Sequence, residues 1–113
     1  GTLLVNADLI QSLLINLVDN AAKAYDTGME NRKVCLTVSG STIEVSDNGR
    51  GIPKEALPRI FEPFYMADKS RSKKAGGSGL GLALVKRIAD AHDAELTVKS
   101  GVGKGTTVRV HFQ

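Results

Sequence analysis

The sequence predicts a two-layer α/β sandwich, in which helices cover one face of a mixed, mostly antiparallel sheet. Two stretches carry apolar residues at helical spacing, and four short stretches alternate apolar with polar residues, as half-exposed strands do. A doubly wound parallel sheet is disfavoured, because its strands would be apolar on both faces. Packing the helices against the apolar face of the sheet buries both apolar surfaces in one core.

The first helix is predicted over residues 7 to about 26, after residues 3–5, which resemble the end of a strand. Gly28 is the predicted stop of this helix. The apolar positions of the helix recur every three or four residues: Leu9, Ile10, Leu13, Leu14, Leu17, Val18, Ala21 and Ala24.

Two hairpins and two further helices follow. Residues 34–38 and 43–46 alternate around Gly40-Ser41, which predicts a hairpin with one wet face. Pro53 then stands near the first turn of a short helix at about residues 54–60. Residues 63–79 have no period and predict a loop, and a second long helix is predicted from residue 80 to about 92. A closing hairpin pairs residues 96–98 with 108–112 through a turn at 101–105.

Length and composition predict one globular domain in a reducing, cytoplasmic setting. The chain has 113 residues and a single cysteine, Cys35, so it cannot form an internal disulfide. The only histidines, His92 and His111, are too few for a zinc cluster. No apolar run is long enough to span a membrane, and no secretory leader is recognisable.

The net charge of +3 is concentrated in one segment, residues 67–77. This segment holds four basic residues against Asp68 alone: Lys69, Arg71, Lys73 and Lys74. A nucleic-acid-binding protein would more often spread its excess along a face or helix. The pattern fits a loop that closes over a polyphosphate, or else an ordinary solvated loop.

Nine of the 12 glycines fall in three clusters, at residues 49–51, 76–81 and 101–105. Gly101, Gly103 and Gly105 predict only a hairpin turn. The cluster at residues 76–81 leads directly into a helix, where free backbone N–H groups and the helix dipole favour an anion; a flexible hinge is the alternative. It fits neither the dinucleotide-binding fingerprint nor the Walker A loop.

Asp47 lies on the apolar face of its predicted strand, with Ile43 and Val45. A carboxylate directed at a core layer needs a strong hydrogen-bond donor, and the exocyclic amine of a purine is one candidate. The alternative is a turn, since Asp47-Asn48-Gly49 is a common turn sequence.

Asn16, Asn20 and Lys23 form one stripe on the first helix. Helical geometry places Asn20 inside the apolar sector, where its amide oxygen could bind Mg²⁺ or, as the alternative, its amide could bond to backbone. Lys23 could then contact phosphates.

Phe61, Phe64 and Tyr65 are predicted to lie in the core or to anchor the following loop. His92 is expected in the last turn of its helix and His111 on the outward face of its strand, and neither is a candidate for catalysis.

Taken together, these segments resemble the ATP-binding catalytic domain of bacterial sensor histidine kinases, in the GHKL ATPase superfamily. The resemblance covers nearly the whole chain and rests on four motifs in the family's order. These are the N box at residues 16–23, the G1 box at 47–53, the F box at 61–64 and the G2 box at 77–82.

The resemblance implies a Bergerat-type fold that binds ATP and Mg²⁺. Asp47 would accept the adenine amine, Asn20 would bind Mg²⁺, and Asn16 and Lys23 would be the catalytic residues at the phosphate end. The other implied cofactor-binding residues are Gly49, Gly51, Ile52, Phe64, Gly77, Gly79, Leu80 and Gly81.

The chain departs from the family pattern at two places. The resemblance implies an ATP lid over residues 66–76, where Met66 replaces a frequent arginine, so a phosphate contact would fall to Lys69 or Arg71. The aromatic residue that often follows the N-box lysine is Ala24 here, with Tyr25 one position later.

Asn16 stands where related ATPases and serine kinases usually carry a glutamate base. A neutral amide cannot accept a proton, so phosphotransfer is favoured over hydrolysis. The alternatives are a GHKL hydrolase or serine-kinase module and a nucleotide-binding regulatory domain.

The expected arrangement is one domain over residues 1–113, with its first strand truncated and the dimerisation and phosphoacceptor domain absent. That domain would supply the acceptor histidine and act with a response regulator. The fragment itself is expected to be a monomer that binds no nucleic acid, within a protein anchored in the bacterial inner membrane.

Overall fold

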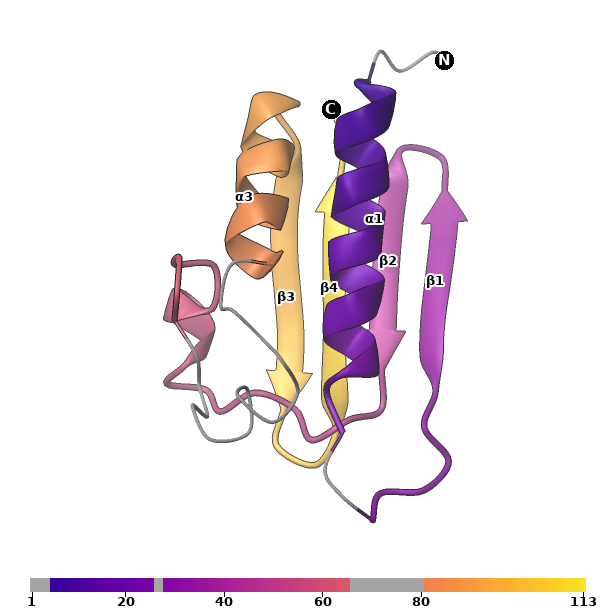
Figure 1. Ribbon diagram of the computed structural model, residues 1–113, viewed down its shortest axis with the longest axis vertical. Helices are drawn as coiled ribbons and strands as arrows, with labels where there is room; N and C mark the ends of the chain where they lie inside the picture. The colour runs from indigo at the N-terminus through magenta and orange to yellow at the C-terminus, as the bar shows by residue number, and fades with distance from the viewer. Residues whose placement is uncertain (1–4, 26–27, 66–80) are drawn as a thin grey trace.

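The computed structural model describes residues 5–25, 28–65 and 81–113. Its four strands form one sheet in the order β1-β2-β4-β3, and each neighbouring pair is antiparallel. Both helices lie on the same face of this sheet (Figure 1). The two-layer sandwich is therefore confirmed, and the strands described here include no parallel pair. The elements in chain order are α1 (Ala7–Ala22), β1 (Val34–Ser39), β2 (Thr42–Asp47), the 3-10 turn η1 (Leu57–Arg59), α3 (Gly81–Ala91), β3 (Glu95–Gly101) and β4 (Gly105–His111).

Helix α1 begins where the sequence predicts but ends earlier. Asn6 caps its N-terminus, and the Asn6 side chain accepts a hydrogen bond from the backbone N–H of Leu9 at 3.1 Å. The helix ends at Ala22, so the predicted continuation to about residue 26, with Gly28 as the stop, is wrong. Ala24 leaves the helix because its backbone oxygen accepts a hydrogen bond from the N–H of Arg50 at 2.8 Å. A tertiary contact thus overrides the local helical preference.

Strand β1 is the outermost strand beyond α1 and lies beneath neither helix (Figure 1). The predicted hairpin with β2 forms around Gly40-Ser41, but β1 is exposed along its whole length. Its apolar residues Val34, Leu36 and Val38 are 40%, 49% and 66% exposed, so the expected burial of one face does not extend to this strand.

In place of the short helix predicted near residues 54–60, the structure has turns on both sides of η1. Pro58 has no backbone N–H to bond to Lys54, so a full α-helix would lack that bond. Leu57 instead donates to the Lys54 oxygen in a tighter turn at 3.3 Å.

Helix α3 and the closing hairpin lie close to their predicted positions. His92 follows the last residue of α3, one position past the helix in which it was expected. Gly101 and Gly105, which were predicted in the turn, pair as end residues of β3 and β4, so the turn contains only residues 102–104.

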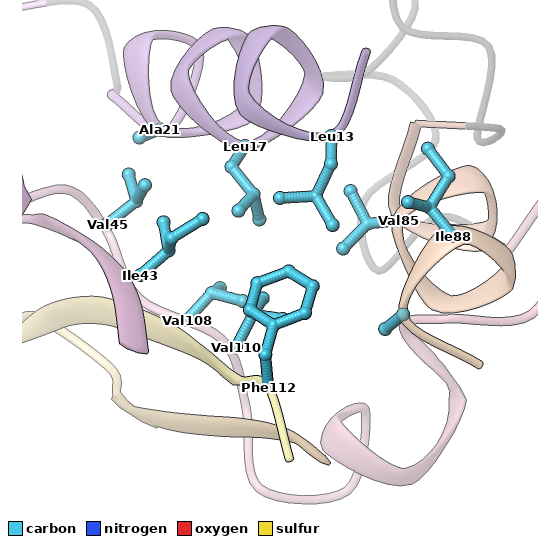
Figure 2. Packing of buried hydrophobic residues seen from close by; sticks show 11 residues of the cluster. Leu13, Leu17, Ala21, Ile43, Val45, Val85, Ile88, Val108, Val110 and Phe112 are labelled. Carbon is cyan, nitrogen blue, oxygen red and sulfur yellow. The ribbon is translucent and has the colours of Figure 1, made fainter. Parts of the chain in front are cut away.

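The core lies between the two helices and the central strands (Figure 2). The fully buried residues Leu13 of α1, Val85 of α3 and Val110 of β4 meet at its centre. Phe112, just past β4, is 4% exposed and completes this layer. The same packing directs the C-terminal ends of α1 and β2 and the N-terminal end of α3 toward one end of the molecule (Figure 1).

Among the described residues, no helix is long and apolar enough to cross a membrane.

Candidate functional site

Asp47, the last residue of β2, is half-buried on the face that carries Ile43 and Val45. Its Oδ1 accepts hydrogen bonds from the backbone N–H groups of Gly49, at 2.8 Å, and Thr106, at 3.2 Å. The turn considered as the alternative is present too, because the Gly49 bond closes it. No described residue donates to Oδ2, so this oxygen can accept a further hydrogen bond.

The surroundings of Asp47 make its charged form costly. Burial raises the pKa of the Asp47 carboxyl above its ordinary value. The two backbone hydrogen bonds and the nearby Arg50 charge act in the opposite direction but do not cancel the effect of burial. A donor from a ligand would stabilise this carboxylate further.

Thr106, which the sequence did not single out, is the register partner of Asp47 on β4. It is 7% exposed, and its hydroxyl lies 2.8 Å from the Ser100 hydroxyl. Ser100 Oγ donates to the Gly105 oxygen and accepts from the backbone N–H of Ile52, so it links the β3–β4 hairpin to the segment after the Asp47 turn. No pattern in the sequence marked Thr106, because the last strand was predicted only over residues 108–112.

The glycine cluster at residues 101–105 does more than form a turn. Gly105 has a φ of +87°, and a Cβ on it would overlap the backbone oxygen of Asp47. Gly51 has a φ of +77°, and a Cβ there would overlap the backbone oxygen of Gly101. The hairpin backbone and the turn after Asp47 therefore approach each other more closely than residues with side chains would allow.

Residues 23–25, which follow α1, also contact the turn after Asp47. The Arg50 backbone N–H donates to the Ala24 oxygen, and its Nη1 donates to the Lys23 oxygen at 3.1 Å. Gly49 is buried there, and a Cβ on it would overlap the Ala24 oxygen. The Tyr25 hydroxyl also reaches the side chain of Asn48, at 2.7 Å.

Asn16 lies beside the first described residue of α3. Its Nδ2 donates to the Ser12 oxygen at 2.8 Å, and a Cβ on Gly81 would lie 3.2 Å from its Oδ1. Asn20 is exposed rather than buried, so the predicted burial of its amide is wrong. Gly81, the first described residue of α3, lies beside Asn16, and Asn20 is one turn further along α1.

The side chain of Asn20 has no hydrogen-bond partner among the described residues, so its amide oxygen can bind a cation. The described residues contain no group of three or more histidines, cysteines, aspartates and glutamates that could hold a metal ion by themselves. An amide oxygen is a ligand that Mg²⁺ accepts, with phosphates and water completing the shell of the ion.

Lys23 follows the last residue of α1, and its ammonium group pairs with Asp19 at 3.0 Å. The two side chains are 41% and 57% exposed, and such a surface pair contributes little to stability. The ammonium group can therefore exchange this partner for another anion at low cost.

Phe64 is 70% exposed with a φ of +65°, so a place in the core is wrong, and its other predicted role, as an anchor for the following loop, stays a prediction. Phe61 and Tyr65 are half-buried, and the Arg59 guanidinium lies over the Tyr65 ring at 4.6 Å. The remaining predicted contacts lie outside the described residues: Lys69, Arg71, Gly77, Gly79, Leu80 and the lid at 66–76.

Comparison with known proteins identifies relatives along nearly the whole chain. The family described as "Histidine kinase-, DNA gyrase B-, and HSP90-like ATPase" matches residues 5–113. The sensor histidine kinase YkoH of Bacillus subtilis (strain 168) is 46% identical over 98% of this chain and 25% of its own length. The signal transduction histidine-protein kinase ArlS of Staphylococcus haemolyticus is 38% identical over 99% of this chain and 25% of its own. The chain thus spans about a quarter of the length of these curated relatives.

Solved structures agree with these matches. The mycobacterial sensor histidine kinase MprB superposes with a TM-score of 0.78 at 28% identity, covering 97% of this chain and 75% of that one. The full-length ShkA structure in complex with AMPPNP gives a TM-score of 0.69 at 28% identity, covering 92% of this chain and 21% of that one.

Proposed function

The chain belongs to the family of histidine kinase-, DNA gyrase B- and HSP90-like ATPases, as an ATPase domain of the sensor histidine kinase type. From this premise we propose that it binds Mg-ATP and donates the γ-phosphate to a histidine on a separate domain. The observation that carries the proposal is the half-buried Asp47, which has one oxygen bound by two backbone N–H groups and the other without a donor among the residues that the structure describes.

At the purine end, Asp47 Oδ2 accepts a hydrogen bond from the exocyclic amine of adenine. Guanine presents a carbonyl oxygen at the equivalent ring position, so GTP would place an acceptor against a carboxylate. This mismatch is the physical reason for a preference for ATP. Gly49, Gly51, Ile52 and Phe64 complete the proposed base side of the site.

At the phosphate end, the Asn20 amide oxygen contributes one ligand to Mg²⁺. When bound, the ion neutralises phosphate charge. Lys23 releases Asp19 and contacts a phosphate, and the N-terminal end of α3 at Gly81 favours the same anion. We assign the remaining phosphate contacts to Gly77, Gly79 and Leu80, and to Lys69 or Arg71.

Transfer is favoured over hydrolysis because Asn16 is a neutral amide whose Nδ2 already donates to the backbone of Ser12. It cannot remove a proton from water, so the acceptor must bring its own nucleophile. Phosphoryl transfer depends mainly on positioning and charge neutralisation, which a nucleotide-binding domain can supply to a separately held imidazole.

The rest of the proposal concerns the longer protein. The ShkA structure named above is a complex with AMPPNP, a nucleotide ligand of that protein, and it supports the assignment of ATP to this fold. We propose that the 113 residues are one catalytic domain whose acceptor lies on a dimerisation and phosphoacceptor domain and whose signal passes to a response regulator. We also propose that this chain alone is a monomer and that the whole protein is anchored in a bacterial inner membrane.

Nucleotide affinity tests the proposal directly. The chain is titrated with a fluorescent ATP analogue, which ATP or GTP then displaces, with and without Mg²⁺. We expect ATP to bind more tightly than GTP and Mg²⁺ to strengthen binding.

Asp47→Asn should weaken ATP binding by about 10- to 100-fold, because it removes a hydrogen bond to a charged acceptor. Asp93→Asn, a change at an exposed aspartate past α3, is the matched control. Equal affinities for ATP and GTP in the unchanged chain would contradict the assignment of Asp47.

A further inference from the structure

The Tyr25 hydroxyl lies at the centre of a compact hydrogen-bonded cluster beside the Asp47 turn. It donates its single proton to one of two acceptors, the Lys33 backbone oxygen at 2.6 Å or Asn48 Oδ1 at 2.7 Å. It accepts from the backbone N–H groups of Lys33, at 3.1 Å, and Asn48, at 3.3 Å. One side chain thus joins three separate stretches of chain.

Asn48 is the other half of this cluster. Its Oδ1 also accepts from the Lys33 backbone N–H at 2.8 Å, and its Nδ2 donates to the Asn31 oxygen at 2.8 Å. Asn48 directly follows Asp47, so whatever holds Asn48 also fixes where β2 ends and in which direction the Asp47 side chain points. The cluster is exposed, and none of its bonds is part of the strand pairing between β1 and β2.

The Tyr25 ring is held as well as its hydroxyl. The Arg32 guanidinium lies 5.4 Å from the ring centroid, and Arg32 Nε donates to the Met29 oxygen at 3.3 Å. Lys23 and Ala24, just after α1, also contact Arg50. Residues 47–51 of the turn therefore lie between the segment that follows α1 and the β3–β4 hairpin.

We propose that Tyr25 is a positioning residue for purine recognition, which acts through Asn48 to hold the Asp47 carboxylate at the angle that selects adenine. This inference rests on the proposed function.

Tyr25→Phe tests the proposal, because it removes only the hydroxyl and keeps the ring under Arg32. We expect ATP affinity to fall about three- to tenfold, the amount expected for the loss of a net hydrogen bond. The ratio of ATP to GTP affinity should fall by a similar factor. The affinity for Mg-tripolyphosphate, which has no base, should not change.

Two further variants separate positioning from general stability. Tyr65→Phe is the matched control, since Tyr65 is half-buried and its described contact with Arg59 is made by the ring. Asn48→Ala should lower the ATP to GTP ratio as Tyr25→Phe does, and the double variant should lose no more than the larger single effect, because both changes break one cluster.

A lower melting temperature in Tyr25→Phe with an unchanged ATP to GTP ratio would overturn the proposal and leave Tyr25 a structural role only. If the unchanged chain itself failed to distinguish ATP from GTP, the proposed function would fail first and this inference with it. Should Tyr25→Phe not fold, Asn48→Ala provides the same measurement. Failure of both variants to fold would show that the cluster serves folding rather than recognition.

Discussion

Asp47 carries a carboxylate at a place where the protein only partly compensates its charge. Two backbone N–H groups bind Oδ1, and burial still raises the pKa of the group above its usual value. A residue selected for stability alone would be neutral here. The cost of the charge is therefore a physical sign that a ligand donor is expected at Oδ2.

The pH dependence of stability follows from this raised pKa. The folded chain binds the Asp47 proton more readily than the unfolded chain, whose value is near 3.8. The stability that Asp47 contributes is therefore fully present below that pH and is lost as pH rises through the raised pKa. Asp47→Asn should accordingly increase the free energy of unfolding of the nucleotide-free chain at neutral pH, and the gain should disappear below pH 3.8. Urea unfolding across this range measures it.

Glu55→Gln is the control for that experiment, because it removes the same formal charge from an exposed position in the turns before η1. The difference in the free energy of unfolding between Glu55→Gln and the unchanged chain should not change with pH in the same way. A lower stability of Asp47→Asn at neutral pH would mean that the backbone bonds to the carboxylate outweigh its burial.

Individual residues show what the sequence could and could not predict about the site. The alternation of Ile43, Val45 and Asp47 placed the carboxylate on the core face, because strand geometry is local. The exposure of Asn20 depends on where α3 begins, and the contact of Thr106 with Asp47 depends on the pairing of β2 with β4. Both are distant along the chain, so no helical or strand period contains them.

Among the elements, β1 shows the limit of a periodic pattern most clearly. Val34, Leu36 and Val38 alternate like the residues of a half-buried strand, and the register partners of Leu36 and Val38 on β2, Val45 and Ile43, are buried. Yet α1 lies over the inner strands and leaves β1 uncovered (Figure 1). The pattern gives the face on which a side chain lies, but the neighbouring layer decides whether that face is buried.

A matched pair of leucine substitutions tests this arrangement. Leu36→Ala on β1 removes a side chain that is 49% exposed, so we expect it to cost less than about 1 kcal/mol. Leu17→Ala on α1 removes one that is 2% exposed and opens a cavity in the core, which should cost about 2–5 kcal/mol. The free energies of unfolding in urea compare the two. Equal costs would show that β1 is covered in solution.

Across the whole molecule, the proposed nucleotide-binding end and the two histidines lie far apart. His111 pairs with Thr42 at one end of the sheet, and Thr106 pairs with Asp47 at the other, five residues along β4. At 3.4 Å per residue this separates the two ends by about 17 Å. His92 follows the C-terminus of α3, and the 11 residues of that helix place it about 16 Å from Gly81.

Both histidines are also engaged. His92 Nε2 accepts the backbone N–H of Asn6 at 3.1 Å, so its Nδ1 carries the proton that is donated to the Ile88 oxygen at 2.9 Å. His111 Nδ1 is hydrogen-bonded to the Thr42 hydroxyl at 2.8 Å. Neither imidazole is placed to attack a phosphate bound between Asn20 and Gly81.

This separation predicts that the chain alone gains no acid-labile phosphate from γ-labelled ATP, although it binds the nucleotide. Phosphate should also be released slowly, since Asn16 is not a base, and Asn16→Glu should increase steady-state release if a carboxylate there can activate water. Binding by the fluorescent analogue shows that each sample is competent. If the unchanged chain were labelled and a variant with both histidines replaced by glutamine were labelled too, another residue would be the acceptor. If replacing His92 or His111 abolished the labelling, the nucleotide would bind elsewhere than at the Asp47 end. Absence of labelling together with tight ATP binding would agree with the proposed transfer to an imidazole on another domain, because His92 and His111 both lie far from the proposed phosphate end.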